Sequence, residues 1–418
     1  MRSKPWSFAL VQAFLVVGLI LVLAPDACAK PKFKVLHTVS GGMFSSLTLD
    51  ANGNLYGVTN AGGAYNDGTI FELKRRPNGK WSEIVVHSFN DDDGLFPNGG
   101  MIFDRAGNLY GTTKEGGATY AGTVFELTPG RDSLGWTYRI LYNFCPEGQL
   151  SGCPHGGRPQ AGVVIDRRGD IYGTAEGGSN GGGVAYELTP GGSVPWSYSV
   201  LHDFGPPNRG GDGSGPTCPL TLDESANLYG TTGSGGAYNA GTVFELGNTL
   251  GGWDENLLYS FCSGGFPCRD GAGPFYGLAF DSAGNFYGTT PGGGANNCSG
   301  AGCGAVFRLK PDGNGGWREN VLYSFRPGES GSYADSPVIF DRSGALYGTT
   351  AVAGIGGCGG YGCGVIYKLT PGAPGKWKYT VLHKFNGADG ANPGGGLTLD
   401  SKGHLYGTAY STVFEITP

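Results

Sequence analysis

Apolar and β-branched residues recur along the chain in short runs, and glycine, asparagine and proline separate these runs. The first complete group starts at Ser46 with SLTLD, continues through GNLYGVT and GTIFEL, and ends with WSEIVVHSF at Phe89. Short runs bounded by turn residues are typical of β-strands. Each group therefore predicts a meander of four strands.

One aspartate marks each copy of this group. The marker residues are Asp50, Asp104, Asp166, Asp223, Asp281, Asp341 and Asp400, at intervals of 54 to 62 residues. A tyrosine followed by glycine lies six residues after each aspartate, so the first hairpin of every copy has the same length. This long period predicts a repeat architecture with one four-stranded blade per copy.

The last copy begins at Leu397 and ends after TVFEI, so it holds only three predicted strands. The segment KFKVLHTV, from Lys32 to Val39, has the pattern of the missing fourth strand. We expect it to complete the last blade, because a closed ring leaves only short, protected strand edges. The predicted fold class is all-β: residues 30–418 form a single seven-bladed β-propeller of four-stranded blades.

Residues 1–29 have the features of a signal peptide. Arg2 and Lys4 precede a mostly apolar run from Phe8 to Leu23, and Ala27-Cys28-Ala29 resembles a cleavage site. Because the run approaches membrane-spanning length, an uncleaved anchor is the alternative. We expect cleavage, export to the periplasm or the medium, and no stable membrane insertion afterwards.

Composition and charge narrow the class of protein. Hydrophobic residues make up 39% and charged residues 15%, a balance that indicates a folded core. The 82 glycines lack the every-third spacing of a triple helix and therefore indicate turns. The net charge of −6 and the absence of a basic block argue against a nucleic-acid partner. We expect a monomer with a ligand outside the cytoplasm.

Nine cysteines remain once Cys28 leaves with the leader, and eight of them form close pairs. Equivalent crossovers carry Cys145 with Cys153 and Cys262 with Cys268, and equivalent second-to-third loops carry Cys298 with Cys303 and Cys358 with Cys363. Four short-range disulfides are predicted for an exported protein. Zinc binding by converging pairs is the alternative. Cys218 is left over, either as a buried free thiol or as an intermolecular link.

The polar positions that recur in every copy favour structural roles. The fourth-strand histidines alternate with tyrosines at one position, namely His37, His87, His202 and His383 with Tyr142, Tyr259 and Tyr323. The marker aspartates are expected to accept backbone hydrogen bonds in their turns. The third-strand glutamates give way to Arg308 and Lys368, which suggests a position near solvent or a pair between blades.

Asp-Gly followed by Pro within a few residues occurs at Asp93, Asp270 and Asp389, in crossovers that we expect near the mouth of the central channel. A turn is the expected role, and a ring of carboxylates around calcium is the alternative. No Ser-His-Asp order, phosphate-binding glycine loop or HExxH helix is found. We assign no catalytic or cofactor-binding residue and leave metal binding open.

Loop length varies on one face of the predicted propeller. Second-to-third loops range from the two residues Tyr410-Ser411 to about a dozen, and crossovers vary too, whereas the first-to-second turn is constant. Variable loops on a rigid scaffold are where binding usually occurs. The candidate ligand contacts are the loop tyrosines Tyr65, Tyr120, Tyr238 and Tyr361.

The unit D-x-x-G-N-L-Y-G-T-T, followed by G-G, G-T-V-F-E-L, W and V-L-Y-S-F, resembles the GloVer (Gloeo-Verruco) tandem repeat of exported bacterial proteins. Asp104 to Leu127 and Asn227 to Leu246 carry the signature almost unbroken. The resemblance implies an exported repeat protein with no established activity, often tethered by a C-terminal anchoring segment. The chain ends at Pro418 without such a hydrophobic segment or sorting signal. A weaker similarity points to kelch-like propellers.

Two functions remain open. We expect a binding module for a glycan, peptide or protein that uses the face formed by the crossovers. The alternative is a propeller lyase or hydrolase with its active site at the channel mouth, which would need a cluster of ionisable groups with perturbed pKa values.

Overall fold

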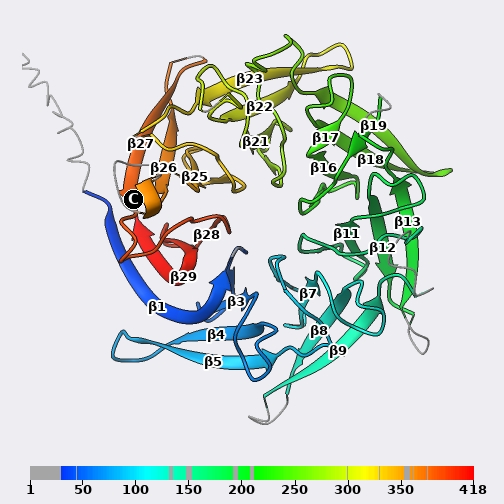
Figure 1. The fold of residues 1–418 in the computed structure, drawn as a ribbon, viewed down its shortest axis with the longest axis vertical. Coiled ribbons are helices and arrows are strands. Elements are labelled where there is room, and N and C mark those ends of the chain that lie inside the picture. Colours follow the sequence, from blue (N-terminus) through cyan, green and yellow to red (C-terminus); the bar gives the residue numbers. More distant parts are fainter. Residues whose placement is uncertain are drawn as a thin grey trace, which may run out of the picture. The chain divides into compact units, whose positions relative to one another are not determined.

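The computed structural model describes residues 30–43, 45–130, 135–146, 153–191, 196–207, 211–298, 300–328, 330–352, 358–360, 362–373 and 375–418. Residues 31–418 form one compact unit. Its sheets are the blades of a seven-bladed β-propeller around a central axis (Figure 1), so the predicted fold class is confirmed. The predicted signal peptide, residues 1–29, lies outside the described residues.

Every blade is antiparallel, and in the first six blades the strands follow chain order from the axis outwards (Figure 1). The first strands are β2 (Thr48–Leu49), β6 (Ile102–Phe103), β10 (Val164–Ile165), β15 (Thr221–Leu222), β20 (Ala279–Phe280), β24 (Ile339–Phe340) and β28 (Leu397–Leu399). The second strands are β3 (Leu55–Thr59), β7 (Leu109–Thr113), β11 (Ile171–Ala175), β16 (Leu228–Thr232), β21 (Phe286–Thr290) and β25 (Leu346–Thr350).

In the first six blades, the two outer strands are longer than the two inner strands. The third strands are β4 (Thr69–Arg75), β8 (Thr123–Pro129), β12 (Val184–Thr189), β18 (Thr242–Thr249), β22 (Ala305–Pro311) and β26 (Val365–Pro371). The fourth strands are β5 (Trp81–Ser88), β9 (Trp136–Asn143), β13 (Ser197–Asp203), β19 (Gly252–Ser260), β23 (Trp317–Ser324) and β27 (Trp377–Lys384).

The last blade joins the two ends of the propeller. β29 (Leu405–Thr417) turns at Tyr410, and its first residues pair with β28 while its last residues pair with β1 (Lys32–Met43). The register with β1 runs from Lys32 opposite Thr417 to Thr38 opposite Thr412. In Figure 1 the blue β1 lies outside the red β29. This is the closure by an N-terminal strand that the sequence predicts.

A few small elements lie outside this pattern. β14 (Gly213–Ser214) and β17 (Ser234–Gly235) pair as a two-stranded sheet. A short 3₁₀ helix, η1, spans Cys358–Gly360. Within the described part of the chain, no helix has the length and hydrophobicity needed to cross a bilayer.

The repeated Gly-Thr-Thr sequence explains how neighbouring blades hold together. The hydroxyl of Thr112 donates to the carbonyl oxygen of Ala161 in the next blade at 2.8 Å. The next residue, Thr113, is 2.8 Å from the hydroxyl of Thr123 on the adjacent third strand. These groups are buried, so their hydrogen bonds satisfy polar atoms that would otherwise be costly.

The glycine before these threonines has a packing role. At Gly111 an added Cβ would lie 2.6 Å from the ring of Phe125, which covers the strand. Phe125 itself is fully buried. Only glycine lets the ring approach this closely, so the motif builds the core of each blade.

The four predicted disulfides are present: Cys145–Cys153, Cys262–Cys268, Cys298–Cys303 and Cys358–Cys363. These pairs therefore do not form the alternative zinc site. Cys218 is a buried free cysteine, and its sulfur accepts a hydrogen bond from the backbone of Thr231 at 3.3 Å.

Candidate functional site

Crossovers and second-to-third loops lie on one face of the propeller, as the blade topology requires. In the crossover between the second and third blades, the backbone NH of Arg158 donates to Ala121 in a second-to-third loop at 2.7 Å. The neighbouring Gly157 bonds to Glu176 in the next such loop. We call this side the crossover face.

A cavity of about 510 Å³ lies at the axis on the crossover face, and all seven blades contribute to it. Its wall consists largely of glycine, serine, proline and backbone from the segments that precede the first strands. The amides of Asn60, Asn98 and Gln160 and the rings of Phe275 and Tyr276 also line it. Among the described residues of this wall, none is Asp, Glu, Lys, Arg or His.

One carboxyl group lies directly behind this wall. A Cβ added to the lining residue Gly394 would lie 3.4 Å from Oδ2 of Asp335. Oδ1 of Asp335 is buried and has no hydrogen-bond partner. Burial raises the pKa of Asp335 to about 7. The group can therefore give or take a proton near neutral pH.

Asp335 was not predicted from the sequence, because no other copy of the repeat has an acidic residue at the equivalent position before its first strand. The only signal was the acidic residue in the segment ADSPV, directly before a first strand.

The predicted ligand contacts lie on the crossover face but do not line the cavity. Tyr65, Tyr120 and Tyr238 are 62%, 52% and 52% exposed, in second-to-third loops of the first, second and fourth blades. Asn60, which starts the loop of Tyr65, is part of the cavity wall. Tyr361 lies outside the described residues.

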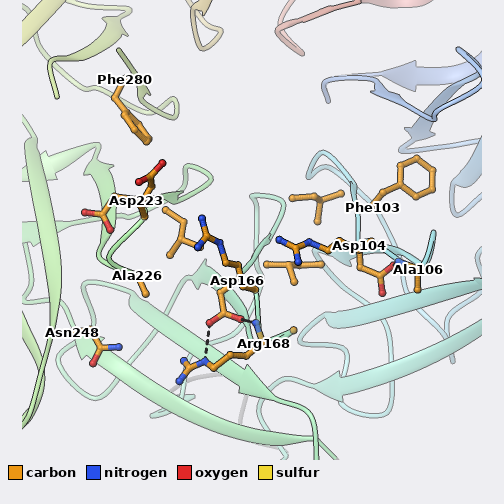
Figure 2. A pocket seen from close by; sticks show the side chains of 16 residues that line it. Phe103, Asp104, Ala106, Asp166, Arg168, Asp223, Ala226, Asn248 and Phe280 are labelled. Atoms are coloured by element: carbon orange, nitrogen blue, oxygen red, sulfur yellow. Dashed lines mark hydrogen bonds and ion pairs between the residues drawn. The ribbon is translucent and has the colours of Figure 1, made fainter. Parts of the chain in front are cut away.

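The opposite face has a wider hollow of about 980 Å³, built from the first-to-second turns of the second, third and fourth blades and from Phe280. Figure 2 shows Asp104, Asp166 and Asp223 at three of these turns. Arg168 pairs with Asp166 at 3.0 Å, drawn as a dashed line, and with Asp170 at 2.9 Å. We call this side the turn face.

The marker aspartates have the structural role that the sequence predicts. Oδ1 of Asp104 accepts hydrogen bonds from the backbone of Ala106 and Asn108 at 2.8 Å, and Oδ2 accepts from the side chains of Asn108 and Tyr110. The other markers accept the same pair of backbone bonds. These carboxylates therefore hold hairpins.

The third-strand position lies near solvent, as expected, at Glu187, Glu245, Arg308, Lys368 and Glu415, which are partly exposed. The expectation is wrong at Glu72 and Glu126, which are only 8% and 7% exposed. Tyr110 donates to Glu126 at 2.8 Å across the same blade. Arg139, on the other neighbouring strand, donates to Glu126 at 2.6 Å. Register places both partners directly opposite Glu126, so they belong to the same blade.

The Asp-Gly motifs form turns, but the predicted position near the channel mouth is wrong. Asp93 and Asp389 bond to His87 and His383 on the outermost strands of their own blades, at 3.0 and 2.9 Å. Asp270 likewise accepts from Tyr259 at 2.8 Å. Each carboxylate also accepts a backbone NH within its own turn.

Comparison with known sequences identifies the family. Residues 18–153, 137–301 and 256–418 each match the Gloeobacter/Verrucomicrobia repeat. The chain belongs to this family. Each matched segment spans more than one blade of the propeller. No curated protein sequence matches the chain.

Solved structures share the fold of this Gloeobacter/Verrucomicrobia repeat protein. An ancestral GH74 enzyme superposes with a TM-score of 0.55 and 9% sequence identity. The match covers 91% of this chain and 51% of the enzyme chain, so the chain spans about half of the enzyme. At this identity the similarity shows the fold alone.

Proposed function

We propose that this repeat protein is exported and binds a neutral glycan through its crossover face. The observation that carries the proposal is the axial cavity, which all seven blades build and whose described lining is uncharged. Sugar hydroxyl groups both donate and accept, so the amides of Asn60, Asn98 and Gln160 suit them. A phosphate or carboxylate ligand favours arginine or lysine partners, which this wall does not supply among its described residues.

Exposed tyrosines around the loops extend this surface. Tyrosine offers a large contact area at a low cost in conformational entropy. Its apolar face can cover the apolar face of a sugar ring while its hydroxyl stays hydrated. Tyr65, Tyr120 and Tyr238 meet this description because more than half of each side chain is exposed.

The disulfides support export. Four bonds in one chain are stable in the periplasm or outside the cell and rare in the cytoplasm. The apolar run at residues 8–23 is the segment that would direct the chain there.

Affinity electrophoresis through gels that contain neutral or anionic polysaccharides tests the proposal. We expect a neutral polysaccharide to retard the protein and the double variant Tyr65→Ala/Tyr238→Ala to weaken binding about tenfold. Leu250→Ala is the matched control, because Leu250 is an exposed apolar residue on a third-to-fourth hairpin. No retardation by any neutral polysaccharide, or equal weakening by the control, would contradict the proposal.

A second candidate is glycoside hydrolysis with Asp335 as the acid–base group. The raised pKa of Asp335, about 7, favours this candidate, because an acid–base group must give and take a proton near neutral pH. Such hydrolysis ordinarily uses two carboxyl groups, and a second one does not line the described cavity wall. New reducing ends released by the parent protein but not by Asp335→Asn would support this function over simple binding.

A further inference from the structure

Each boundary between neighbouring blades brings together two side chains from consecutive fourth strands. Four boundaries carry stacked rings with centroids 3.6 to 4.2 Å apart: His87–Tyr138, Tyr142–Tyr198, Tyr323–Tyr379 and His383–Phe33. At the other three boundaries a glutamate replaces one of the rings: Glu83, Glu255 and Glu319. At these three boundaries a carboxyl group therefore takes the place of an aromatic contact.

The boundary between the third and fourth blades collects three potential metal ligands. His202 lies on β13, Asp212 in the following crossover and Glu255 on β19. Their ligand atoms all lie within 4.8 Å of one another. Nε2 of His202 is 3.4 Å from Oδ2 of Asp212 but makes no hydrogen bond. Oε1 of Glu255 is also buried without a hydrogen-bond partner.

The histidines at the equivalent position of the first and sixth blades, His87 and His383, have hydrogen-bond partners. Nε2 of His87 and of His383 lies 3.0 and 2.9 Å from the carboxylates of Asp93 and Asp389, and each ring is covered by a stacked aromatic ring. At His202 the covering ring is replaced by a second carboxylate, from Glu255. Two neighbouring carboxylates in a half-buried site repel each other unless a cation lies between them.

We propose that His202, Asp212 and Glu255 bind a divalent transition-metal ion between the third and fourth blades, with Zn²⁺ as the expected ion. One imidazole and two carboxylates suit zinc, whereas calcium prefers six or more oxygen ligands. Zinc needs ligands at about 2.0–2.2 Å, which places two ligand atoms of a tetrahedral site about 3.3–3.5 Å from each other. Nε2 of His202 and Oδ2 of Asp212, 3.4 Å apart, already have this spacing.

Backbone hydrogen bonds hold the carboxylate of Asp212 in a fixed position. Asp212 accepts hydrogen bonds from the backbone of Gly205 and Gly213, both at 2.7 Å, which fix the carboxylate in place. Three protein ligands leave at least one coordination position for water or another ligand. The ion would also connect β13 to β19 and so stabilise the boundary.

Calorimetric titration of the full chain with ZnCl₂, together with melting curves, tests the site. We expect a single ion to bind and to raise the melting temperature. Glu255→Tyr should weaken zinc binding about 100-fold or more while the protein stays folded, because it recreates the His–Tyr stack of His87 and Tyr138. His202→Gln should have the same effect on binding.

Glu83→Gln is the control. Glu83 pairs with His37 at 2.9 Å at another blade boundary. Among the described residues, no aspartate joins this pair to form a group of three ligands. Zinc binding should be unchanged in this variant. The proposal is overturned if the parent binds no zinc, if Glu255→Tyr binds it as tightly as the parent, or if calcium stabilises the parent as strongly as zinc.

Discussion

At the scale of single residues, the fourth-strand position that faces the preceding blade holds either an aromatic ring or a glutamate. Where it holds an aromatic ring, a stack forms, as between Tyr142 and Tyr198 with centroids 4.2 Å apart. Where it holds Glu319, the carboxyl group is buried beside Asp270, and Oε1 has no hydrogen-bond partner. Burial, with a smaller effect of Asp270, raises the pKa of Glu319 to about 8.

This pKa predicts a pH dependence of stability. The folded protein keeps the proton of Glu319 up to about pH 8, whereas the unfolded chain loses it near 4.5, so folding stability falls as pH rises through this window. Glu319→Gln has no proton to lose. We expect it to be more stable than the parent by on the order of 2 kcal/mol at pH 9 and nearly equal at pH 4, measured by urea unfolding. A difference that is constant across this range would refute the assignment.

The sequence could predict residues whose role recurs in every copy. Asp104 and its counterparts share one turn, so their hydrogen bonds follow from a fixed spacing. His202 shares its position with His87, and this similarity hid the different partners that surround it in space. Asp335 has no acidic counterpart in the other crossovers, so no internal comparison could reveal it. Asp212 does have counterparts, because Asp212-Gly213 repeats the Asp-Gly motif of Asp93, Asp270 and Asp389, and only its position near Glu255 in space distinguishes it.

At the scale of elements, disulfides order the crossovers. Cys262–Cys268 closes a crossover whose turn is also held by Asp270, which accepts from the backbone of Cys262 and Ser263 at 3.1 and 2.9 Å. The disulfide lowers the conformational entropy of the unfolded chain by closing a loop. Because this loop is short, the gain in folding stability is small.

The double variant Cys262→Ala/Cys268→Ala should therefore lose about 2 kcal/mol of unfolding free energy. Chemical denaturation under non-reducing conditions measures the loss. The other three disulfides stay intact in this variant, so a thiol count on the denatured protein should still detect only Cys218. Additional thiols in the unreduced parent would contradict the disulfide assignment.

At the scale of the whole molecule, the ring depends on contacts between the two ends of the propeller. Phe33 on β1 stacks on His383 with centroids 3.6 Å apart and contacts Phe385 and Phe414. The pattern KFKVLHTV predicts this pairing because only a fourth-strand pattern was missing from the last copy. The cavity could not be predicted in the same way, since its wall is mostly glycine and backbone, which carry no distinctive side chain.

Phe33→Ala tests closure of the ring. We expect a loss of about 2 kcal/mol of stability, because the partly buried ring packs against residues near the C-terminus. Lys34→Ala is the matched control, since the neighbouring Lys34 is exposed and should change stability by less than about 0.5 kcal/mol. Equal unfolding curves for parent and Phe33→Ala would contradict closure.

Hydrogen–deuterium exchange with and without a neutral polysaccharide tests whether the crossover face binds a neutral glycan, because it reports on both faces at once. We expect the ligand to slow exchange in the crossover-face loops at residues 60–68, 116–122 and 235–241. Exchange in the turn-face hairpins at residues 104–108, 166–170 and 223–227 should stay unchanged. Protection confined to the turn face, or none with any neutral polysaccharide, would contradict binding of a neutral glycan at the crossover face.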